Sequence, residues 1–331
     1  MRRLKGPKDT KVELGLLGYK AKKVRYVTVT RGEIPQKSIT ATYMLNNGTG
    51  YIKIKKFAEN TYPEMLIALA QLSQENLRNL VIDLRGNLGG YMASAVQIAN
   101  EFLPKNRLIV YMEGRHSPRQ DFASDGKGSY QQIPLVVLID EGSASASEIL
   151  SGAIQDNDRG TIIGRRSFGK GLVQKPLSFK DGSMIRLTTA RYYTPSGRCI
   201  QKPYEKGDRS AYAKDVINRY NKGELTNADS IHFPDSLRYQ TLRNKRTVYG
   251  GGGIMPDIFV PLDTTKYTRC YRELSAKSII INESLKYIDS NRKALSKAYP
   301  TFEKFRKRYD IPASLVDSVL SKGEKQNIKP K

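Results

Sequence analysis

Ser145 and Lys170 are the two residues whose surroundings could support nucleophilic chemistry. Ser145 lies in the run Gly142-Ser143-Ala144-Ser145-Ala146, where the pattern of a buried strand changes to that of a helix. The first amides of a helix have no partner within the helix, and the dipole there favours negative charge. A serine at this point could attack a carbonyl whose oxyanion the helix stabilises. The run equally fits a plain serine N-cap, and it lacks the Gly-x-Ser-x-Gly spacing.

A serine nucleophile needs a base, and the sequence offers few candidates. The two histidines, His116 and His232, lie in polar stretches and are expected on the surface. A lysine can act as the base if burial removes water and lowers its pKa toward neutrality. Lys170, in the run Phe168-Gly169-Lys170-Gly171, is a candidate of this kind. Its local sequence equally fits a lysine in solvent, which is the ordinary location of that residue.

Two other motifs overlap Lys170, and both lack essential parts. The run 164–170 fits the Gly-x4-Gly-Lys of a phosphate-binding loop, but Gly171 replaces the Ser or Thr that holds magnesium. Ser167 and Lys170 also fit the Ser-x-x-Lys of penicillin-binding enzymes, which requires both residues on one helical turn. The glycines beside Lys170 disfavour a helix by about 1 kcal/mol each. The sequence therefore disfavours both interpretations.

The composition excludes several classes of protein. The chain has 331 residues, of which 39% are hydrophobic and 27% charged, as in a globular protein of about two domains. No apolar run reaches the roughly 18 residues that a membrane span needs. The two cysteines, Cys199 and Cys270, are too few for a disulfide scaffold or a cysteine-based zinc site, although one bridge between them stays open. Two histidines disfavour a multi-histidine metal site.

The charge of the chain is strongly basic. The formal net charge is +24, which favours anionic partners such as nucleic acid, anionic lipid or acidic peptides. No RNP, zinc-finger or basic-zipper pattern accompanies this charge, so we expect a solvated basic surface and no nucleic-acid partner. Nucleic-acid binding is kept as an alternative that a salt titration can test.

Alternating strands and helices must position the two candidate residues. Buried strands are predicted at 80–84, 108–112, 135–139 and 161–163, and helices at 63–72, 92–102 and 146–155. This alternation is typical of βαβ-type units. Hairpins with Asn-Gly and Asp-Gly turns are predicted within 42–54 and 172–193.

The remaining segments are predicted from weaker patterns. Residues 12–17, 24–30 and 258–260 are expected to be strands, and 271–290, 293–308 and 313–320 helices. The polar stretch 114–128 is expected to be a loop, and 203–249 to be a polar excursion over the surface.

Several motifs, taken in order, resemble the carboxy-terminal processing peptidases, which are tail-specific Ser/Lys proteases of peptidase family S41. The resemblance runs from about Gly6 to Pro261 and is carried by the stretches Val81–Gly90, Gly142–Leu150, Gly152-Ala153, Ile163-Gly164, Ser167–Gln174, Asp181–Ser183, Tyr193–Gly197 and Gly253–Asp257. The first contains the family's Asp-Leu-Arg-x-Asn-x-Gly-Gly. Such a string of motifs is far more specific than any one of them.

The resemblance implies a role for four side chains. Ser145 would be the nucleophile, and Lys170, twenty-five positions later, the general base. Gln174 would orient the lysine. Glu148, three residues after the serine and therefore on the same helix face, would support the site.

The resemblance also implies an oxyanion hole, a fold and an activity. The hole would consist of the amide of Ala146 and that of a glycine, Gly90 in preference to Gly89. The implied fold is α/β, a crotonase-like or ClpP-like spiral of ββα units, which agrees with the predicted alternation. The implied activity is hydrolysis of peptide bonds in protein substrates near their C-termini, without a metal or cofactor.

The resemblance divides the chain into three regions. Residues 1–36 resemble the last strands of a PDZ domain, 37–262 the protease core, and 263–331 a helical region that could mediate homo-oligomer formation. The early PDZ strands and an export signal are missing from the sequence. We therefore expect a truncated form of a periplasmic or otherwise extracytoplasmic protease, whose incomplete PDZ groove could not capture substrate tails by adding a strand.

Two further alternatives are kept. The scaffold could bind peptides or other ligands without hydrolysing them, because a fold does not fix a function. The core could also be held inactive by the incomplete PDZ domain.

Overall fold

The structure, a computed structural model, describes residues 4–18, 21–34, 36–45, 48–204, 209–265 and 268–329. The chain forms two compact units. One unit is Gln36–Leu262, which contains Ser145 and Lys170. The other combines Met1–Pro35 with Asp263–Lys331.

A six-stranded sheet with the order β14-β9-β8-β5-β4-β3 forms the centre of the Gln36–Leu262 unit. Its strands are β3 (Ile39–Met44), β4 (Thr49–Ile54), β5 (Asn79–Asp83), β8 (Leu135–Ile139), β9 (Thr161–Gly164) and β14 (Ile258–Phe259). β3 pairs antiparallel with β4, and the other pairs are parallel. The strands predicted at 80–84, 135–139 and 161–163 are confirmed, and they are neighbours in the sheet.

The short apolar runs of the sequence become the interior of this sheet. Ile52, Ile82, Val137 and Ile162 are aligned in register across four adjacent strands. All four side chains are fully buried. Strands that are covered on both faces have continuous apolar sequences without alternation, which explains why β5 and β8 are so uniformly hydrophobic.

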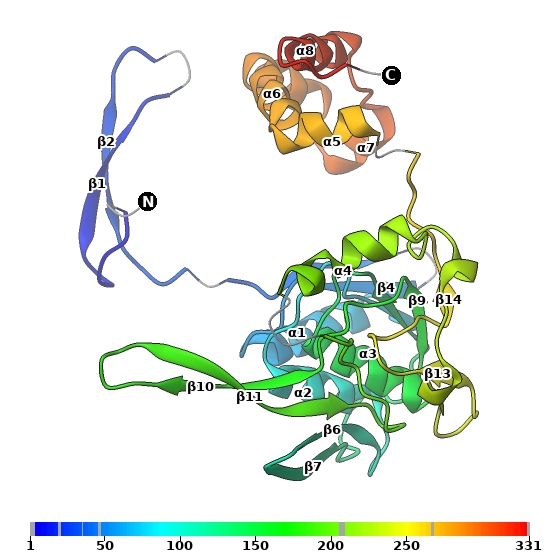
Figure 1. Cartoon of the computed structure of the whole chain (residues 1–331). Coiled ribbons are helices and arrows are strands. Elements are labelled where there is room, and N and C mark those ends of the chain that lie inside the picture. Colours follow the sequence, from blue (N-terminus) through cyan, green and yellow to red (C-terminus); the bar gives the residue numbers. More distant parts are fainter. Residues whose placement is uncertain are drawn as a thin grey trace. The chain divides into compact units, whose positions relative to one another are not determined.

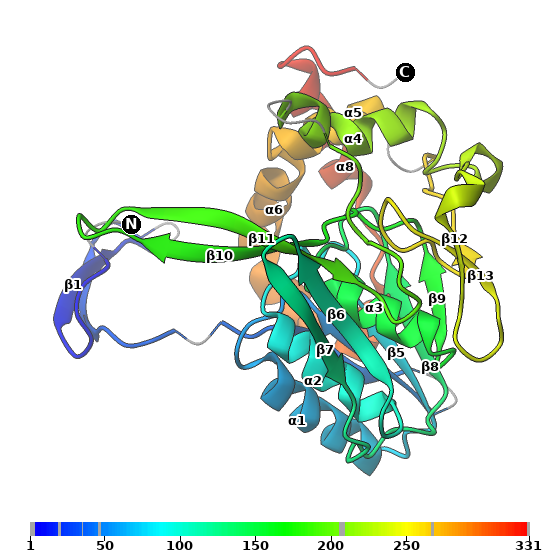
Figure 2. The same cartoon turned by 60° about the horizontal axis from the view of Figure 1, so that its bottom comes forward.

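Three helices pack beside one another along the sheet, with α2 between α1 and α3 (Figure 2). They are α1 (Thr61–Gln74), α2 (Met92–Phe102) and α3 (Ala146–Asp156). Their buried residues Met65, Leu69, Leu72, Ile98, Phe102, Leu150 and Ile154 join the strand residues in one hydrophobic core. The fold of this unit is therefore α/β, as predicted.

A second sheet, with the order β10-β11-β6-β7, contacts α2 and α3 through β6. Its strands are β6 (Leu108–Gly114), β7 (Ser117–Ala123), β10 (Leu172–Ser178) and β11 (Met184–Tyr193). The prediction that 114–128 is a loop is wrong, because β7 pairs antiparallel with β6. Most side chains of β7 are exposed, so its sequence lacks the apolar alternation that marks a strand.

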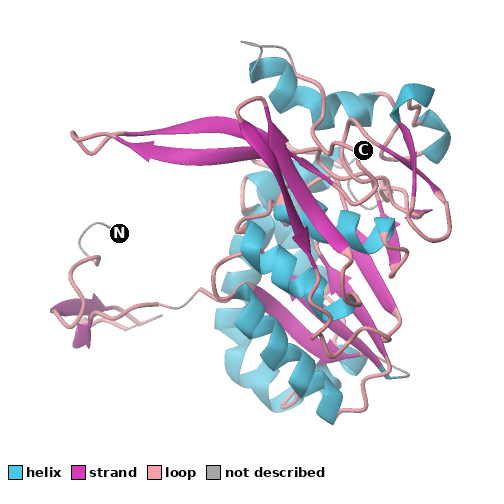
Figure 3. Ribbon diagram, turned by 90° about the horizontal axis from the view of Figure 1, so that it is seen from below, coloured by secondary structure: helices cyan, strands magenta, loops and turns pink. Residues whose placement is uncertain are grey.

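The predicted hairpin with the Asp-Gly turn is confirmed as β10 and β11. Its tip extends well beyond the rest of the unit (Figures 1 and 3). The ladder shifts register between Val173 and Gln174, which is a local bulge close to the start of β10. The hairpin therefore begins directly after the segment that carries Lys170.

The segment 203–249 is only partly the surface excursion that its polar sequence predicts. It contains helix α4 (Arg209–Asn221), two 3-10 turns, η2 (Ala228–Ser230) and η3 (Asp235–Leu237), and a small hairpin of β12 (Arg238–Gln240) and β13 (Thr247–Tyr249). Arg219, Leu225, Thr241 and Val248 are buried. The prediction failed at these residues because two of them are polar and gain their burial from distant contacts.

The second unit consists of a hairpin and a group of helices. Strands β1 (Lys11–Leu16) and β2 (Arg25–Thr30) confirm the strands predicted at 12–17 and 24–30, and they pair antiparallel. The helices are α5 (Arg269–Ala276), α6 (Ile279–Ala298), α7 (Phe302–Arg308) and α8 (Ala313–Glu324). The prediction of one helix over 271–290 is wrong, because Ser278 adopts a left-handed conformation with φ 58° that separates α5 from α6.

The described residues bear on the expectations for membrane spans, metal sites and cysteines. None of the described helices is long and apolar enough to cross a membrane. Within the same residues, no group of His, Cys, Asp and Glu side chains is arranged to hold a metal ion. Cys199 and Cys270 are both free thiols.

Candidate active site

Three loops meet at the carboxyl ends of neighbouring parallel strands. The glycine loop (Gly86–Gly90) follows β5, the serine loop (Asp140–Ser145) follows β8, and the lysine loop (Arg165–Gly171) follows β9. In open α/β sheets, ligands bind outside this edge of the sheet. Strand order alone therefore brings together three motifs that are separated in the sequence.

Ser145 precedes α3 in a strained backbone conformation. Its φ is 56° and its ψ is −113°, in a region that residues other than glycine rarely adopt. Such a conformation costs on the order of 1–3 kcal/mol and persists only where the surroundings hold it. Ala144 N–H donates to Asn87 O at 2.9 Å, and Ile149 N–H donates to Ser145 O at 3.0 Å. The backbone is therefore fixed on both sides of the serine.

The glycine loop approaches Ser145 more closely than any side chain would allow. A Cβ atom added to Gly89 would lie 2.7 Å from the Cβ of Ser145 and 2.5 Å from Ala144 O. A Cβ added to Gly90 would lie 1.8 Å from Phe57 O. Gly89 and Gly90 also have φ angles of 93° and 145°, so both sterics and conformation require glycine.

The amides at this point differ in their hydrogen bonding. The N–H of Gly89 donates to Oδ1 of Asn87 at 2.9 Å. The N–H groups of Gly90 and Ala146 donate to no other atom within the described residues. Gly90 is exposed, whereas Gly89 is buried. A substrate oxygen would therefore find free donors on Gly90 and Ala146.

Glu148 connects the serine to the lysine loop. Its carboxylate is fully buried and accepts four hydrogen bonds. Oε2 accepts from the N–H of Ser145 and from the N–H of Lys170, each at 2.8 Å. Oε1 accepts from Ser167 Oγ at 2.5 Å and from Gly169 N–H at 2.6 Å. One oxygen atom therefore ties the backbone of Ser145 to that of Lys170.

The charge state of Glu148 reflects two opposing effects. Burial raises the pKa of this carboxyl above its ordinary value. The four donors favour the charged form and act against that rise. Because every partner is a donor, we assign the ionised form, which can accept all four hydrogen bonds.

The lysine loop is held to the core by its own backbone as well. Phe168 N–H donates to Ser143 O at 2.9 Å, and Ser167 N–H donates to Ile254 O at 3.0 Å. The side chain of Lys170 is partly buried. Gln174, by contrast, is exposed on β10, and its side chain makes no hydrogen bond to Lys170 in this part of the described chain. The structure thus connects the backbones of Ser145 and Lys170 through Glu148, and the role expected of Gln174 stays a prediction.

The other motifs considered in the sequence are not supported by the structure. The segment after Lys170 is strand β10, so the phosphate-binding loop lacks its helix. Ser167 and Lys170 lie in a loop and not on one helical turn. His116 and His232 are exposed, as predicted.

Two residues at the site escaped the sequence prediction. Asn87 donates through Nδ2 to Ile54 O at 2.9 Å, while its Oδ1 holds Gly89. Ser167 donates to Glu148 and accepts from Ile254 N–H at 2.6 Å. The only signal for Asn87 was its place in the motif Asp83–Gly90. The only signal for Ser167 was its place in the stretch Ser167–Gln174, because its partners are distant in the sequence.

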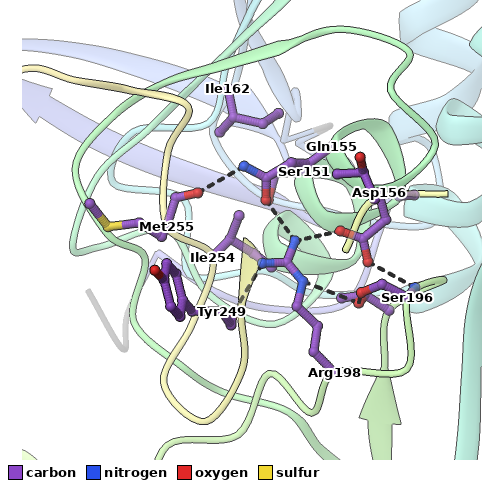
Figure 4. Close-up of polar contacts among 12 residues, drawn as sticks. Ser151, Gln155, Asp156, Ile162, Ser196, Arg198, Tyr249, Ile254 and Met255 are labelled. Carbon is purple, nitrogen blue, oxygen red and sulfur yellow. Dashed lines mark hydrogen bonds and ion pairs between the residues drawn. The ribbon is translucent and has the colours of Figure 1, made fainter. Parts of the chain in front are cut away.

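The far end of α3 is fixed by a buried arginine (Figure 4). Arg198 Nη2 donates at 2.6 Å to both Gln155 Oε1 and Asp156 Oδ1. Its Nη1 donates to Tyr249 O at 3.1 Å, and Asp156 Oδ2 accepts from Ser196 N–H at 3.0 Å. Arg198 is 1% exposed. Removing one partner of such a buried pair is strongly destabilising, so this network fixes the helix that begins beside Ser145.

Comparison with known protein families gives two matches. Residues 48–208 match the sequence profile of peptidase family S41. Residues 270–331 match the profile of a family of unknown function (DUF8443). The first match contains the glycine, serine and lysine loops, and the second contains α6 to α8 and all of α5 except Arg269.

Individual proteins are similar to the same part of the chain. A "Carboxyl-terminal-processing protease" of Synechocystis sp. is 38% identical over 203 residues, which is 60% of this chain and 47% of that protein. A "Probable CtpA-like serine protease" of Staphylococcus haemolyticus is 30% identical over 260 residues, 71% of this chain and 52% of that protein. The chain thus spans about half the length of these relatives.

Among solved structures, the "Photosystem II D1 C-terminal processing protease" is similar to this chain. It is 26% identical, with a TM-score of 0.49, and the match covers 80% of this chain and 58% of that chain.

Proposed function

The chain belongs to peptidase family S41 through residues 48–208, and from this premise we propose that it is a serine endopeptidase with a Ser145–Lys170 dyad. The substrates would be protein chains, cleaved near their C-termini, since the relatives carry the name carboxyl-terminal-processing protease. The observation that carries the proposal is the shared Oε2 atom of Glu148, which accepts from the amides of Ser145 and Lys170.

Acyl transfer would begin with proton transfer from the Ser145 hydroxyl to neutral Lys170 as the serine oxygen attacks the peptide carbonyl. The carbonyl oxygen becomes negatively charged and is stabilised by the free amides of Gly90 and Ala146, at the positive end of α3. Lys170 then donates its proton to the leaving amine. A water molecule, deprotonated by the same lysine, hydrolyses the acyl-enzyme.

Two exposed side chains, one within the glycine loop and one directly after it, suggest which part of a substrate the enzyme would contact. Leu88 and Tyr91 are 73% and 60% exposed and flank Gly89-Gly90. Exposed apolar side chains next to a reacting centre can pack against apolar groups of a substrate. We therefore assign an apolar substrate segment to this position.

The proposal extends to the wider organisation of the protein. The core 37–262 would be the family's spiral of ββα units, and the β1–β2 hairpin would belong to a PDZ domain. The protein would act outside the cytoplasm, as its resemblance to the carboxy-terminal processing peptidases implies. Immunodetection of the natural protein in fractionated cells would test this location, and finding it only in the cytoplasmic fraction would contradict it.

The first test is cleavage of a denatured protein by the wild type and by Ser145→Ala. The masses of the wild-type fragments should place the cleavage sites near the substrate's C-terminus. The variant should produce no fragments, because no nucleophile remains. Ser151→Ala, at a buried serine on the same helix, is the matched control and should retain cleavage. Turnover by Ser145→Ala would refute the assignment. Peptide binding without cleavage by the wild type would favour a non-catalytic binding protein.

The second test concerns the base. Lys170→Ala should abolish turnover, and wild-type activity should rise between pH 5 and pH 9, because only the neutral amine can accept the serine proton. Initial rates on one peptide substrate across this range give the profile. A flat profile, or an active Lys170→Ala, would contradict a lysine base.

A further inference from the structure

The lysine loop has two sides, and only one of them faces the core. Its N–H groups on residues 167–170 donate to Ile254 O, Ser143 O and Glu148. Its carbonyl groups accept hydrogen bonds from elsewhere. The donors to the carbonyls of residues 166, 167 and 169 are Arg219 of helix α4 and Lys202, whose side chain contacts α4.

Arg219 of α4 is directed at two of these carbonyls. Its Nη2 donates to Arg166 O at 2.8 Å, and its Nη1 donates to Ser167 O at 3.0 Å. Its Nε donates to Glu224 Oε2 at 3.2 Å, and the same oxygen accepts from Arg166 Nη2 at 2.5 Å. Arg219 is 4% exposed. Each of the three guanidinium nitrogen atoms therefore donates a hydrogen bond, and the side chain is almost inaccessible to water.

A second contact joins α4 to the loop. The Lys202 ammonium lies 3.9 Å from the ring centre of Phe168 and 4.1 Å from that of Tyr212. It pairs with Asp215 at 3.0 Å, and Lys202 N–H donates to Gly169 O at 3.0 Å. Lys202 is 5% exposed. Phe168 and Gly169 are thus held from the same side as the carbonyls of Arg166 and Ser167.

The contacts of Arg219, Tyr212 and Asp215 come from outside the residues that the family profile matches, whereas Lys202 lies within them. The S41 match ends at residue 208, and α4 begins at Arg209. Glu148 accepts from the N–H side of the loop, and Arg219 of α4 donates to its carbonyl side. A loop held on both sides has little freedom to displace the side chain of Lys170.

We propose that α4 is a clamp on the lysine loop and that Arg219 is a positioning residue for the reaction. Its guanidinium fixes the carbonyls of Arg166 and Ser167, and the loop in turn fixes Lys170. The catalytic effect of this clamp rests on the proposed function, whereas its effect on the loop does not.

The experiment compares Arg219→Gln, Arg219→Lys and the control Lys214→Gln, which removes an exposed charge from the same helix. Steady-state cleavage of one peptide gives kcat and KM. Arg219→Gln should lower kcat by about 10- to 100-fold with little change in KM, because a displaced base slows the chemical step and not binding. The kcat of Arg219→Lys should lie between those of the wild type and Arg219→Gln. An ammonium keeps the charge but cannot present a planar set of donors to two carbonyls and a carboxylate. Lys214→Gln should match the wild type.

Amide hydrogen exchange gives a second readout that does not depend on activity. The amides of Gly169 and Lys170, which donate to Glu148, should exchange about 10-fold faster in Arg219→Gln and at the wild-type rate in Lys214→Gln. Unchanged exchange at these amides, or full kcat in Arg219→Gln or in Arg219→Lys, would overturn the clamp. If Arg219→Gln does not fold, Arg219→Lys provides both readouts. A wild type without proteolysis would refute the proposed function, and the exchange rates would still test the clamp.

Discussion

At the scale of single residues, the geometry around Ser145 requires a residue without a side chain at position 89. Gly89 has no Cβ, and this allows its backbone to lie against Ser145. The strained φ of Ser145 is held by hydrogen bonds from its neighbours, so the strain is stored where the reaction would occur. A small change at Gly89 should therefore affect the serine directly.

The substitution Gly89→Ala tests this closeness. The added methyl would meet the Cβ of Ser145 at 2.7 Å, so the serine must move, and a displacement of about 1 Å can cost about 100-fold in kcat/KM. Gly86→Ala is the matched control, because Gly86 has φ 68° but no atom within 4 Å of an added Cβ. It should lose about 1 kcal/mol of stability from its conformation and keep its activity. Equal activity of the two variants in peptide cleavage would contradict the steric argument.

At the scale of elements, parallel pairing of β5, β8 and β9 brings the three loops to one edge. The strand β5 ends in Asp83, which is fully buried and accepts from Tyr51 Oη at 2.6 Å and Arg85 Nη2 at 2.8 Å. Burial alone would disfavour the charge, but the hydrogen bonds from Arg85 and Tyr51 outweigh it and hold the pKa of Asp83 well below its usual range. Burial, followed by the hydrogen bond to the Asp83 carboxylate, raises the pKa of Tyr51 to about 12, while Arg85 acts against this rise.

The contacts of the Asp83 carboxylate with Arg85 and Tyr51 predict that the free energy of unfolding depends on pH. A carboxyl whose pKa is depressed in the folded state stabilises the protein above its unfolded pKa of about 3.9 and loses that effect as the pH falls below it. Asp83→Asn should therefore lower the free energy of unfolding at pH 7 by on the order of 2 kcal/mol. The difference from the wild type should shrink below about pH 4.

Urea unfolding at several pH values measures this effect. Asp121→Asn is the matched control, because Asp121 also pairs with an arginine two residues away, at 2.7 Å, but with about half of each side chain exposed. Exposed pairs contribute about 0–1 kcal/mol. A pH-independent loss in Asp83→Asn would show that packing and not charge is responsible.

At the scale of the whole molecule, the two units carry different family relationships. The S41 match lies within Gln36–Leu262, and the match to the family of unknown function lies within Asp263–Lys331. The net charge of +24 belongs to the chain as a whole and is not explained by the candidate site. A basic surface of this kind attracts polyanions without specificity.

The charge leads to a prediction about nucleic acid. Binding to a random DNA duplex, measured by fluorescence anisotropy, should be detectable at low salt and weaken to a Kd of about 10 µM or higher near 0.15 M salt, as for non-specific electrostatic binding. Tight binding that persists at this salt concentration would make nucleic acid a partner and revive that alternative.

The sequence by itself determined the buried strands of the central sheet and the chemistry at the start of α3. Continuous apolar runs predicted the buried strands, and the serine at a strand-to-helix junction predicted a hydroxyl beside free amides, because these features depend on neighbours within a few residues. The motif Val81–Gly90 predicted an amide of Gly89 or Gly90 at the site only through the family resemblance.

Only the tertiary structure decided how the parts are joined. The Glu148 carboxylate accepts from amides at positions 145 and 170, and Arg219 reaches carbonyls at 166 and 167, from a segment that appeared to be polar surface. The strand β7 formed because β6 was beside it. These contacts join residues that are distant along the chain, and their polar side chains become buried only once the fold places a partner opposite them.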